Sequence, residues 1–253
     1  MKGITFYAHS NTPALQFAVE RLRNLGITVA DSPGDTVTHL ILGVPSFDKD
    51  GCLRCGGTLQ SLLDRLPDSV TIIGGNLPPD QVAGYRVLDL LQDDRYLAEN
   101  AAITADCAIS IARQNMNIVW QDCPVLILGW GRIGKCLAQA LRFAGADVTV
   151  AARKPADMAI LQGLGYRAED IHKLNYGLMR YRVIFNTVPQ PVLTAEQTAH
   201  CRKNCILLEL ASQPGIAGDH IISALGLPGK YAPESSGRLI AQTVIRLILG
   251  REC

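Results

Sequence analysis

The residues best suited to chemistry form a glycine-rich segment near the middle of the chain, where Gly129, Gly131 and Gly134 make a GxGxxG pattern. The first glycine permits a tight turn, the second lets the backbone approach a diphosphate, and the third lets a helix pack closely on a strand. The N–H groups and positive end of such a helix attract phosphates. We therefore expect phosphate contacts from the whole segment, that is Gly129, Trp130, Gly131, Arg132, Ile133 and Gly134.

The sequence around this segment fits a dinucleotide-binding unit. An apolar run over 124–128 predicts a buried strand before it, and a helical pattern over 132–144 follows it. A second strand, predicted over 147–152, ends just under twenty residues past Gly134, which is the spacing of a βαβ nucleotide unit. The alternative is a glycine-rich turn that binds nothing, but this context favours dinucleotide binding.

The end of the second strand indicates which dinucleotide would bind. A site selective for NAD usually has Asp or Glu here, which binds the ribose 2′-hydroxyl. This sequence has Ala152 instead, followed by Arg153 and Lys154. A 2′-phosphate would meet cations and no repelling carboxylate, so we expect NADP, with NAD possible. The alternative interpretation is that both cations are simply solvated surface residues.

Three loops follow the later strands of this half, over 186–189, 211–215 and 226–233. Ligands of open α/β sheets lie outside the carboxyl ends of the strands, so we expect these loops near the nicotinamide end of the cofactor. The alternative is that the loops merely cap their strands. The residues that we expect to contact the cofactor here are Asn186, Thr187, Val188, Pro189, Ala211 and Ser212.

The elements that must position these residues alternate between strands and helices along the whole chain. The first half predicts strands over 3–8, 39–44, 70–74 and 85–90, with a helix that starts at Pro13 after the cap Thr12. We expect an α/β protein with a smaller N-terminal α/β (flavodoxin-like) domain over 1–93 and an interdomain helix over 94–118. A doubly wound parallel-sheet Rossmann domain, with a C-terminal helix, would occupy 119–253.

Composition excludes several classes of function. The 253 residues include 24 Lys and Arg against 23 Asp and Glu, a net charge of +1, so no basic field attracts nucleic acid or an anionic membrane. No apolar stretch approaches the ~18 residues of a membrane span, and the first residues predict a strand and not a signal peptide. We therefore expect a cytoplasmic protein.

Eight cysteines raise the question of a metal or redox site. Cys52 and Cys55 form a CxxC pair, and Cys201 and Cys205 form a wider one. Structural zinc usually takes two closely spaced pairs, and the second pair here is spaced by three residues. Zinc and a redox CxxC both stay open, but we expect ordinary reduced thiols and no metal.

Several of these segments together resemble the family of the dipicolinate synthase A subunit, sporulation proteins of endospore-forming bacteria. The segments are 100–106, 129–134, 152–153, 186–189, 210–215, 226–230 with Ala232 and Pro233, and Gly237. The resemblance is good over about 95–253 and loose over the first 90 residues. The stretch between Gly215 and Gly226 looks shorter than the family pattern, so the helix before the last strand should be nearly absent, and the N-terminal domain also looks abbreviated.

The resemblance implies an NAD(P)-dependent oxidoreductase that oxidises dihydrodipicolinate, or its hydrated precursor, to dipicolinate. It also implies that the partner is a flavoprotein-like B subunit, and we expect a homo-oligomer. A dicarboxylate substrate needs cations and polar donors, for which Lys230, Ser212 and Thr104 are the catalytic candidates. Further candidates are Thr187, Gln213 and Ser46.

Two other functions remain open from the sequence. A two-domain 2-hydroxyacid dehydrogenase usually needs a protonatable His with a carboxylate partner, and only His220, beside Asp219, lies near the sixth strand. The shortened loop also leaves room for a non-catalytic protein that binds NADP.

Overall fold

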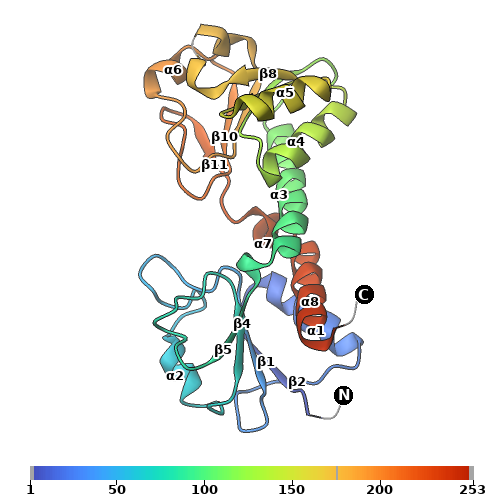
Figure 1. Cartoon of the computed structure of the whole chain (residues 1–253), viewed down its shortest axis with the longest axis vertical. Coiled ribbons are helices and arrows are strands. Elements are labelled where there is room, and N and C mark those ends of the chain that lie inside the picture. Colours follow the sequence, from blue (N-terminus) through green and yellow to red (C-terminus); the bar gives the residue numbers. More distant parts are fainter. Residues whose placement is uncertain (1–2, 175, 251–253) are drawn as a thin grey trace. The chain divides into compact units, whose positions relative to one another are not determined.

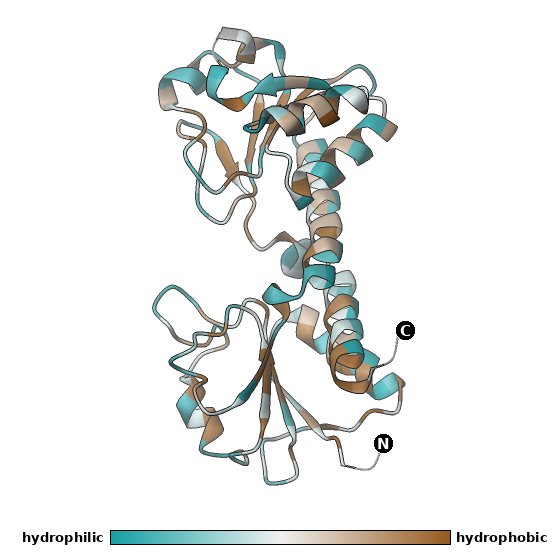
Figure 2. Ribbon diagram, in the orientation of Figure 1, coloured by the Kyte–Doolittle hydropathy of each residue, from teal (hydrophilic) through white to brown (hydrophobic). Residues whose placement is uncertain are grey.

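The computed structural model describes residues 3–174 and 176–250, which fold into two compact units. Unit 1 is built from Met1–Asn100 together with Pro228–Cys253, and unit 2 from Ala101–Leu227. Both units are α/β layers around a parallel sheet (Figure 1). Figure 2 shows hydrophobic residues along the strands of both sheets.

The sheet of unit 1 has five parallel strands in the order β2-β1-β3-β4-β5. This is the flavodoxin-like order, as the sequence predicted for the N-terminal domain. The strands are shorter than predicted, and β2 was not expected. Their bounds are β1 Phe6–His9, β2 Val29–Ala30, β3 His39–Leu42, β4 Thr71–Gly74 and β5 Arg86–Asp89.

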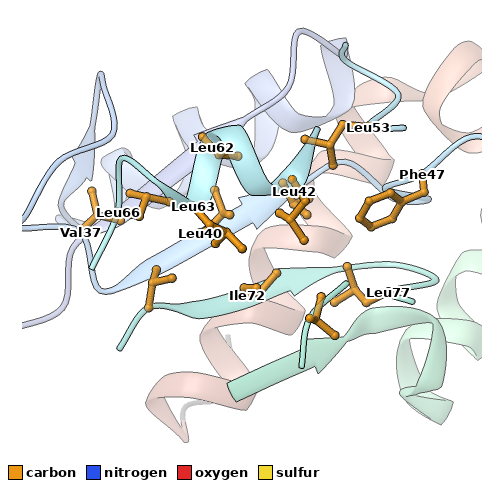
Figure 3. Close-up of a cluster of buried hydrophobic side chains, with 13 residues drawn as sticks. Val37, Leu40, Leu42, Phe47, Leu53, Leu62, Leu63, Leu66, Ile72 and Leu77 are labelled. Atoms are coloured by element: carbon orange, nitrogen blue, oxygen red, sulfur yellow. The ribbon is translucent and has the colours of Figure 1, made fainter. Parts of the chain in front are cut away.

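Two helices flank this sheet within the first hundred residues. Helix α1, Pro13–Asn24, begins where the sequence predicted, because the Thr12 hydroxyl accepts a hydrogen bond from the Leu15 amide at 3.4 Å. Helix α2, Leu59–Leu63, was not predicted. It covers a cluster of buried side chains in which Leu40, Leu42 and Ile72 of the sheet meet Leu62, Leu63 and Leu66 (Figure 3).

The C-terminal helix α8, Pro233–Leu249, belongs to unit 1 and not to the second domain, where we expected it. It lies beside α1 (Figure 1), and the two helices approach so closely at Gly237 that a Cβ there would lie 2.3 Å from the Ala14 carbonyl oxygen. An apolar helix stripe predicts burial but not which surface provides it. The sequence favours Ser235 or Ser236 as the cap of this helix, but the helix starts earlier, with Pro233 in its first turn.

The sheet of unit 2 has six parallel strands in the order β11-β10-β9-β6-β7-β8. Counted within the unit this is 6-5-4-1-2-3, the doubly wound Rossmann order, as predicted. The chain reverses its direction of winding between β6 and β9. The bounds are β6 Pro124–Leu128, β7 Asp147–Ala152, β8 Arg167–Asp170, β9 Val183–Asn186, β10 Ile206–Glu209 and β11 Ile221–Ser223.

The helices of the central part of the chain follow the predicted pattern with two differences. The stretch between Gly215 and Gly226 contains no helix, as expected, but the predicted loop after β11 forms a short helix, α7 (Leu227–Tyr231). Helix α6 was missed, although Thr194 and Gln197 form a capping box at its start. The bounds are α3 Asp94–Gln114, α4 Arg132–Phe143, α5 Pro155–Gly163, α6 Ala195–Ala199 and α7 Leu227–Tyr231, with 3₁₀ turns η1 Leu90–Gln92, η2 Ile171–Lys173 and η3 Tyr176–Arg180.

Among the residues that the structure describes, no helix is both long and apolar enough to cross a bilayer.

Candidate dinucleotide-binding site

The turn between β6 and α4 requires glycine at its first position for two reasons. Gly129 has φ +104°, a conformation that side chains other than glycine rarely adopt. A Cβ there would also lie 2.5 Å from the Thr187 hydroxyl and 2.8 Å from the Val188 Cγ2. The turn is therefore pressed against the loop that follows β9.

The other two glycines of the segment have opposite surroundings. A Cβ on Gly134 would lie 2.2 Å from the Gly129 carbonyl oxygen, so α4 packs directly on the turn. A Cβ on Gly131 would meet no atom within 4 Å, because this residue faces open space at the first turn of α4. Helix first turns leave N–H groups without an intrahelical acceptor. The open space beside Gly131 is thus where a diphosphate fits these residues.

Thr187 joins the two halves of the sheet at the point where the winding reverses. Both its amide and its hydroxyl donate hydrogen bonds to the Leu128 carbonyl, at 3.0 and 2.8 Å. On the other side of the turn, the Gly129 amide donates to the Ala151 carbonyl at 2.9 Å. The carboxyl ends of β6, β7 and β9 are therefore tied together around the turn, at the edge where sheets of this order bind ligands.

The end of β7 carries no acidic group. Ala152 is buried, while Arg153 and Lys154 are exposed at the start of α5. In the described part of the chain neither cation forms an ion pair. Both are available to an anionic ligand, which fits a 2′-phosphate better than a 2′-hydroxyl.

Trp130, the second residue of the segment, packs against protein. Its ring meets the Tyr166 ring edge-on at 5.9 Å, and the Lys135 ammonium lies 5.7 Å from its centroid. Arg132 is exposed and Ile133 is partly buried on the first turn of α4. The Trp130 indole therefore anchors the turn, and the backbone of the turn stays available for phosphate contacts.

Asn186, which we expected to contact the cofactor, is fully buried with its amide group engaged by the protein. Its Nδ2 donates to both carboxylate oxygens of Glu209, at 2.8 and 2.9 Å, and to the Val188 carbonyl at 3.0 Å. Its Oδ1 accepts from the Val188 amide at 3.0 Å. Asn186 thus braces the loop after β9, and its partner Glu209 was not among the residues that the sequence singled out.

The remaining cofactor candidates lie at the same edge of the sheet, in different surroundings. Val188 and Thr187 are partly buried and Pro189 is exposed in the loop after β9. In the loop after β10, Ala211 is buried, whereas Ser212 and Gln213 are exposed. The structure therefore brings the two loops and the glycine-rich turn to one edge of one sheet.

The substrate candidates outside these loops are placed differently. Thr104 is buried on α3. Lys230 is an exposed residue of α7 in unit 1, with its ammonium 5.2 Å from the Tyr231 ring centroid. Ser46, also in unit 1, is buried, donates to the Gly43 carbonyl at 2.8 Å and accepts from the Gly75 amide at 2.9 Å. Ser46 therefore holds a loop of its own unit.

The cysteines give no metal cluster within the described residues. Cys52, Cys55, Cys201 and Cys205 are free thiols, and Cys253 lies outside the described part of the chain. The Cys205 thiol hydrogen-bonds to Cys201, which raises the pKa of Cys205 and lowers the pKa of Cys201. Burial raises the pKa of Cys55.

His220 does not show the arrangement of a 2-hydroxyacid dehydrogenase. It is exposed with φ +59°. Within the described residues it has no carboxylate partner, and the adjacent Asp219 is also exposed.

Comparison with known proteins finds similarity to the A subunit of dipicolinate synthase. No protein-family model matches the chain. The A subunit of dipicolinate synthase from Bacillus subtilis (strain 168) is 27% identical over 202 residues, which cover 75% of this chain and 68% of that protein. The crystal structure of the corresponding A subunit from Bacillus halodurans has a TM-score of 0.84 at 22% identity, with 97% of each chain covered. The resemblance predicted from the sequence is confirmed.

A further solved structure shares the fold of this chain. The transhydrogenase from Sinorhizobium meliloti matches with a TM-score of 0.73 at 14% identity, covering 96% of this chain and 93% of that one. At this identity the match establishes the fold, two parallel-sheet α/β units of which the second is of the Rossmann type.

Proposed function

We propose that this chain is an NADP-dependent oxidoreductase of the same type as the dipicolinate synthase A subunit, acting in the cytoplasm. Its reaction would be the oxidation of dihydrodipicolinate, or of its hydrated precursor, to dipicolinate. The observation that carries this proposal is the 27% identity to the Bacillus subtilis protein over 202 residues. The glycine-rich turn supports it, since Gly131 leaves space for a diphosphate.

The residues that would hold the dinucleotide come from three places at one sheet edge. The backbone of 129–134 and the first turn of α4 would bind the diphosphate, and Arg153 with Lys154 would bind the 2′-phosphate. The loops at 186–189 and 211–212 would border the nicotinamide, which supplies a hydride acceptor when bound. NAD would use the same diphosphate contacts but leave the two cations without a phosphate partner.

The substrate would be held by cationic and polar groups because it carries two carboxylates. Lys230 is an exposed ammonium suited to one of them, and Ser212 and Gln213 offer exposed donors after β10. Thr104 is buried, so its part would be to support the site through α3.

A direct assay tests the proposal. Enzymatically made dihydrodipicolinate is mixed with the purified chain and NADP or NAD, with and without a B-type flavoprotein partner, and the ultraviolet band of the pyridine product is followed. We expect product formation faster than the spontaneous background. No rate above background in any combination would contradict the proposed reaction.

The same preparation distinguishes the other two functions. Tight NADPH binding with no dipicolinate in any combination would favour a non-catalytic nucleotide-binding protein. Robust NADPH-dependent turnover of any compound in a panel of 2-keto acids would favour a 2-hydroxyacid dehydrogenase. Light scattering of the protein by itself and with the B-type flavoprotein would test the expected homo-oligomer and the partner.

A further inference from the structure

We propose that Glu209 is the positioning residue that shapes the nicotinamide side of the dinucleotide site. Glu209 is the last residue of β10, and its side chain is 3% exposed. This inference rests on the proposed binding of a nicotinamide nucleotide. The Glu209 carboxylate is buried and would not touch the ligand itself. Its role would be to hold in place the two loops that would contact the ligand.

The Glu209 carboxylate accepts hydrogen bonds from the loop after β10 and from Asn186, the last residue of β9. One oxygen accepts from the Ala211 amide at 3.0 Å, and the other accepts from the Gly215 amide at 2.7 Å and the Ile216 amide at 3.1 Å. Both oxygens also accept from Asn186 Nδ2, at 2.8 and 2.9 Å. A single side chain thus replaces the backbone acceptors that the irregular segment 210–216 lacks.

Close approach of the second loop depends on glycine at 215. A Cβ there would lie 2.5 Å from Asn186 Nδ2 and 2.8 Å from the Val188 carbonyl oxygen. The loop after β10 is therefore packed directly on the loop after β9. Any displacement of one loop must displace the other.

The same contacts extend to the glycine-rich turn. Asn186 is bonded to Val188 in both directions, and Val188 Cγ2 lies 2.8 Å from the position of a Cβ on Gly129. Glu209 therefore sets the distance between the turn that would bind diphosphate and the loops that would border the nicotinamide. Strands β9 and β6 separate β10 from β7, at whose end the 2′-phosphate would bind.

The contacts require a carboxylate and not merely a side chain of this shape. Every partner of Glu209 is an N–H donor, so both oxygens must accept. Within the described residues no cation forms an ion pair with Glu209. In Glu209→Gln, the new NH₂ group would point at other donors and open the loops.

The binding of two ligands distinguishes a positioning role of Glu209 from a general loss of protein stability. NADP and 2′-phospho-ADP-ribose share the diphosphate and the 2′-phosphate, but only NADP carries nicotinamide. Calorimetric titration of wild type, Glu209→Gln and the exposed control Glu196→Gln gives both dissociation constants. We expect Glu209→Gln to weaken NADP binding by about tenfold or more and 2′-phospho-ADP-ribose by less than about twofold, with the control unchanged.

A second variant keeps the test decisive if Glu209→Gln does not fold. Asn186→Ala leaves the carboxylate with its backbone donors but removes the link to the loop after β9, so NADP should again weaken more than 2′-phospho-ADP-ribose. Equal weakening of both ligands, or no change for NADP, would overturn the positioning role. Wild-type protein that binds neither ligand would overturn the proposed nucleotide binding itself, and this inference with it.

Discussion

Gly129 and Thr187 are in close contact at the point of the second sheet where the direction of winding reverses, between β6 and β9. The Thr187 hydroxyl donates to the Leu128 carbonyl at 2.8 Å, and a Cβ on Gly129 would lie 2.5 Å from that hydroxyl oxygen. The first glycine of the GxGxxG segment is therefore required by a neighbour outside the segment as well as by its own φ of +104°. The turn and the loop after β9 are therefore packed directly on each other, as in a largely pre-formed ligand site.

Gly131 and Gly134 should respond to alanine in opposite ways. Gly131→Ala adds a methyl group to open space, so we expect unfolding stability within about 0.5 kcal/mol of wild type but NADP binding weakened about tenfold or more. Gly134→Ala drives a methyl group into the Gly129 carbonyl and should cost about 1–3 kcal/mol. Urea unfolding and calorimetric titration of both variants check this. Undiminished NADP binding by Gly131→Ala would contradict a diphosphate at this turn.

Arg153→Asp should change the affinity for NADP and the affinity for NAD differently. The substitution replaces a cation by a repelling carboxylate, so NADP binding should weaken by about tenfold or more, while NAD binding is retained or improved. Lys203→Asp makes the same charge change on an exposed residue before β10, at the opposite end of the strands, and serves as control. Unchanged NADP affinity would mean that Arg153 does not touch the 2′-phosphate.

Lys230→Gln should affect the substrate and not the nucleotide. Loss of a cation that binds a carboxylate should raise the KM for dihydrodipicolinate about tenfold or more and leave the NADP dissociation constant unchanged. Steady-state kinetics beside titration of NADP check both parts, with Lys203→Gln as control. An unaltered KM would remove Lys230 from the substrate site.

Asp93 should make unit 1 sensitive to acid. Burial favours a higher pKa for Asp93, but the Arg246 guanidinium at 2.6 Å and the amides of Tyr96 and Arg95 outweigh it and lower the pKa below its ordinary value of 3.8. Because the folded state binds the proton less readily than the unfolded state, this stabilisation is present above the ordinary pKa. It is lost as the pH falls through the lowered value.

Asp93→Asn tests this pH dependence. It should lower the free energy of unfolding by about 1–3 kcal/mol at pH 7, and the difference from wild type should shrink as the pH falls below 3.8. Asp31→Asn, at an exposed ion pair with Arg23, should have no measurable effect. A difference between Asp93→Asn and wild type that does not change with pH would contradict the argument.

The contact between α1 and α8 should tolerate no larger residue at Gly237. A methyl group there meets backbone atoms of α1, the Ala14 carbonyl oxygen at 2.3 Å and the Ala18 amide nitrogen at 2.9 Å, which cannot rotate away. We expect Gly237→Ala to lower the free energy of unfolding by about 1–3 kcal/mol. Gly229→Ala, where nothing lies within 4 Å, is the matched control and should be neutral or slightly stabilising. Equal stability of the two variants would contradict the close packing.

Local sequence determined the elements around the glycine-rich turn almost to the residue. β6 and β7 have the predicted bounds, and α4 ends one residue early. The start of α1 was also predictable, because the cap Thr12 and Pro13 act on the backbone beside them. The short helices α2 and α6 were missed because five residues are too few for a helical periodicity to appear.

What the sequence could not determine is which distant surfaces meet. The apolar stripe of α8 required a partner, but only the folded chain brings Gly237 against α1 in the first unit. Likewise a lone Glu at a strand end carries no signal, and Glu209 becomes significant only when β9 and β10 pair and set its carboxylate beside Asn186 and the 211–216 amides. Capping and turn formation depend on neighbours in the chain, whereas helix docking and buried hydrogen bonds depend on neighbours in space. The glycine-rich turn could therefore be predicted from the sequence, and the carboxylate that contacts the loops around it could be identified only in the tertiary structure.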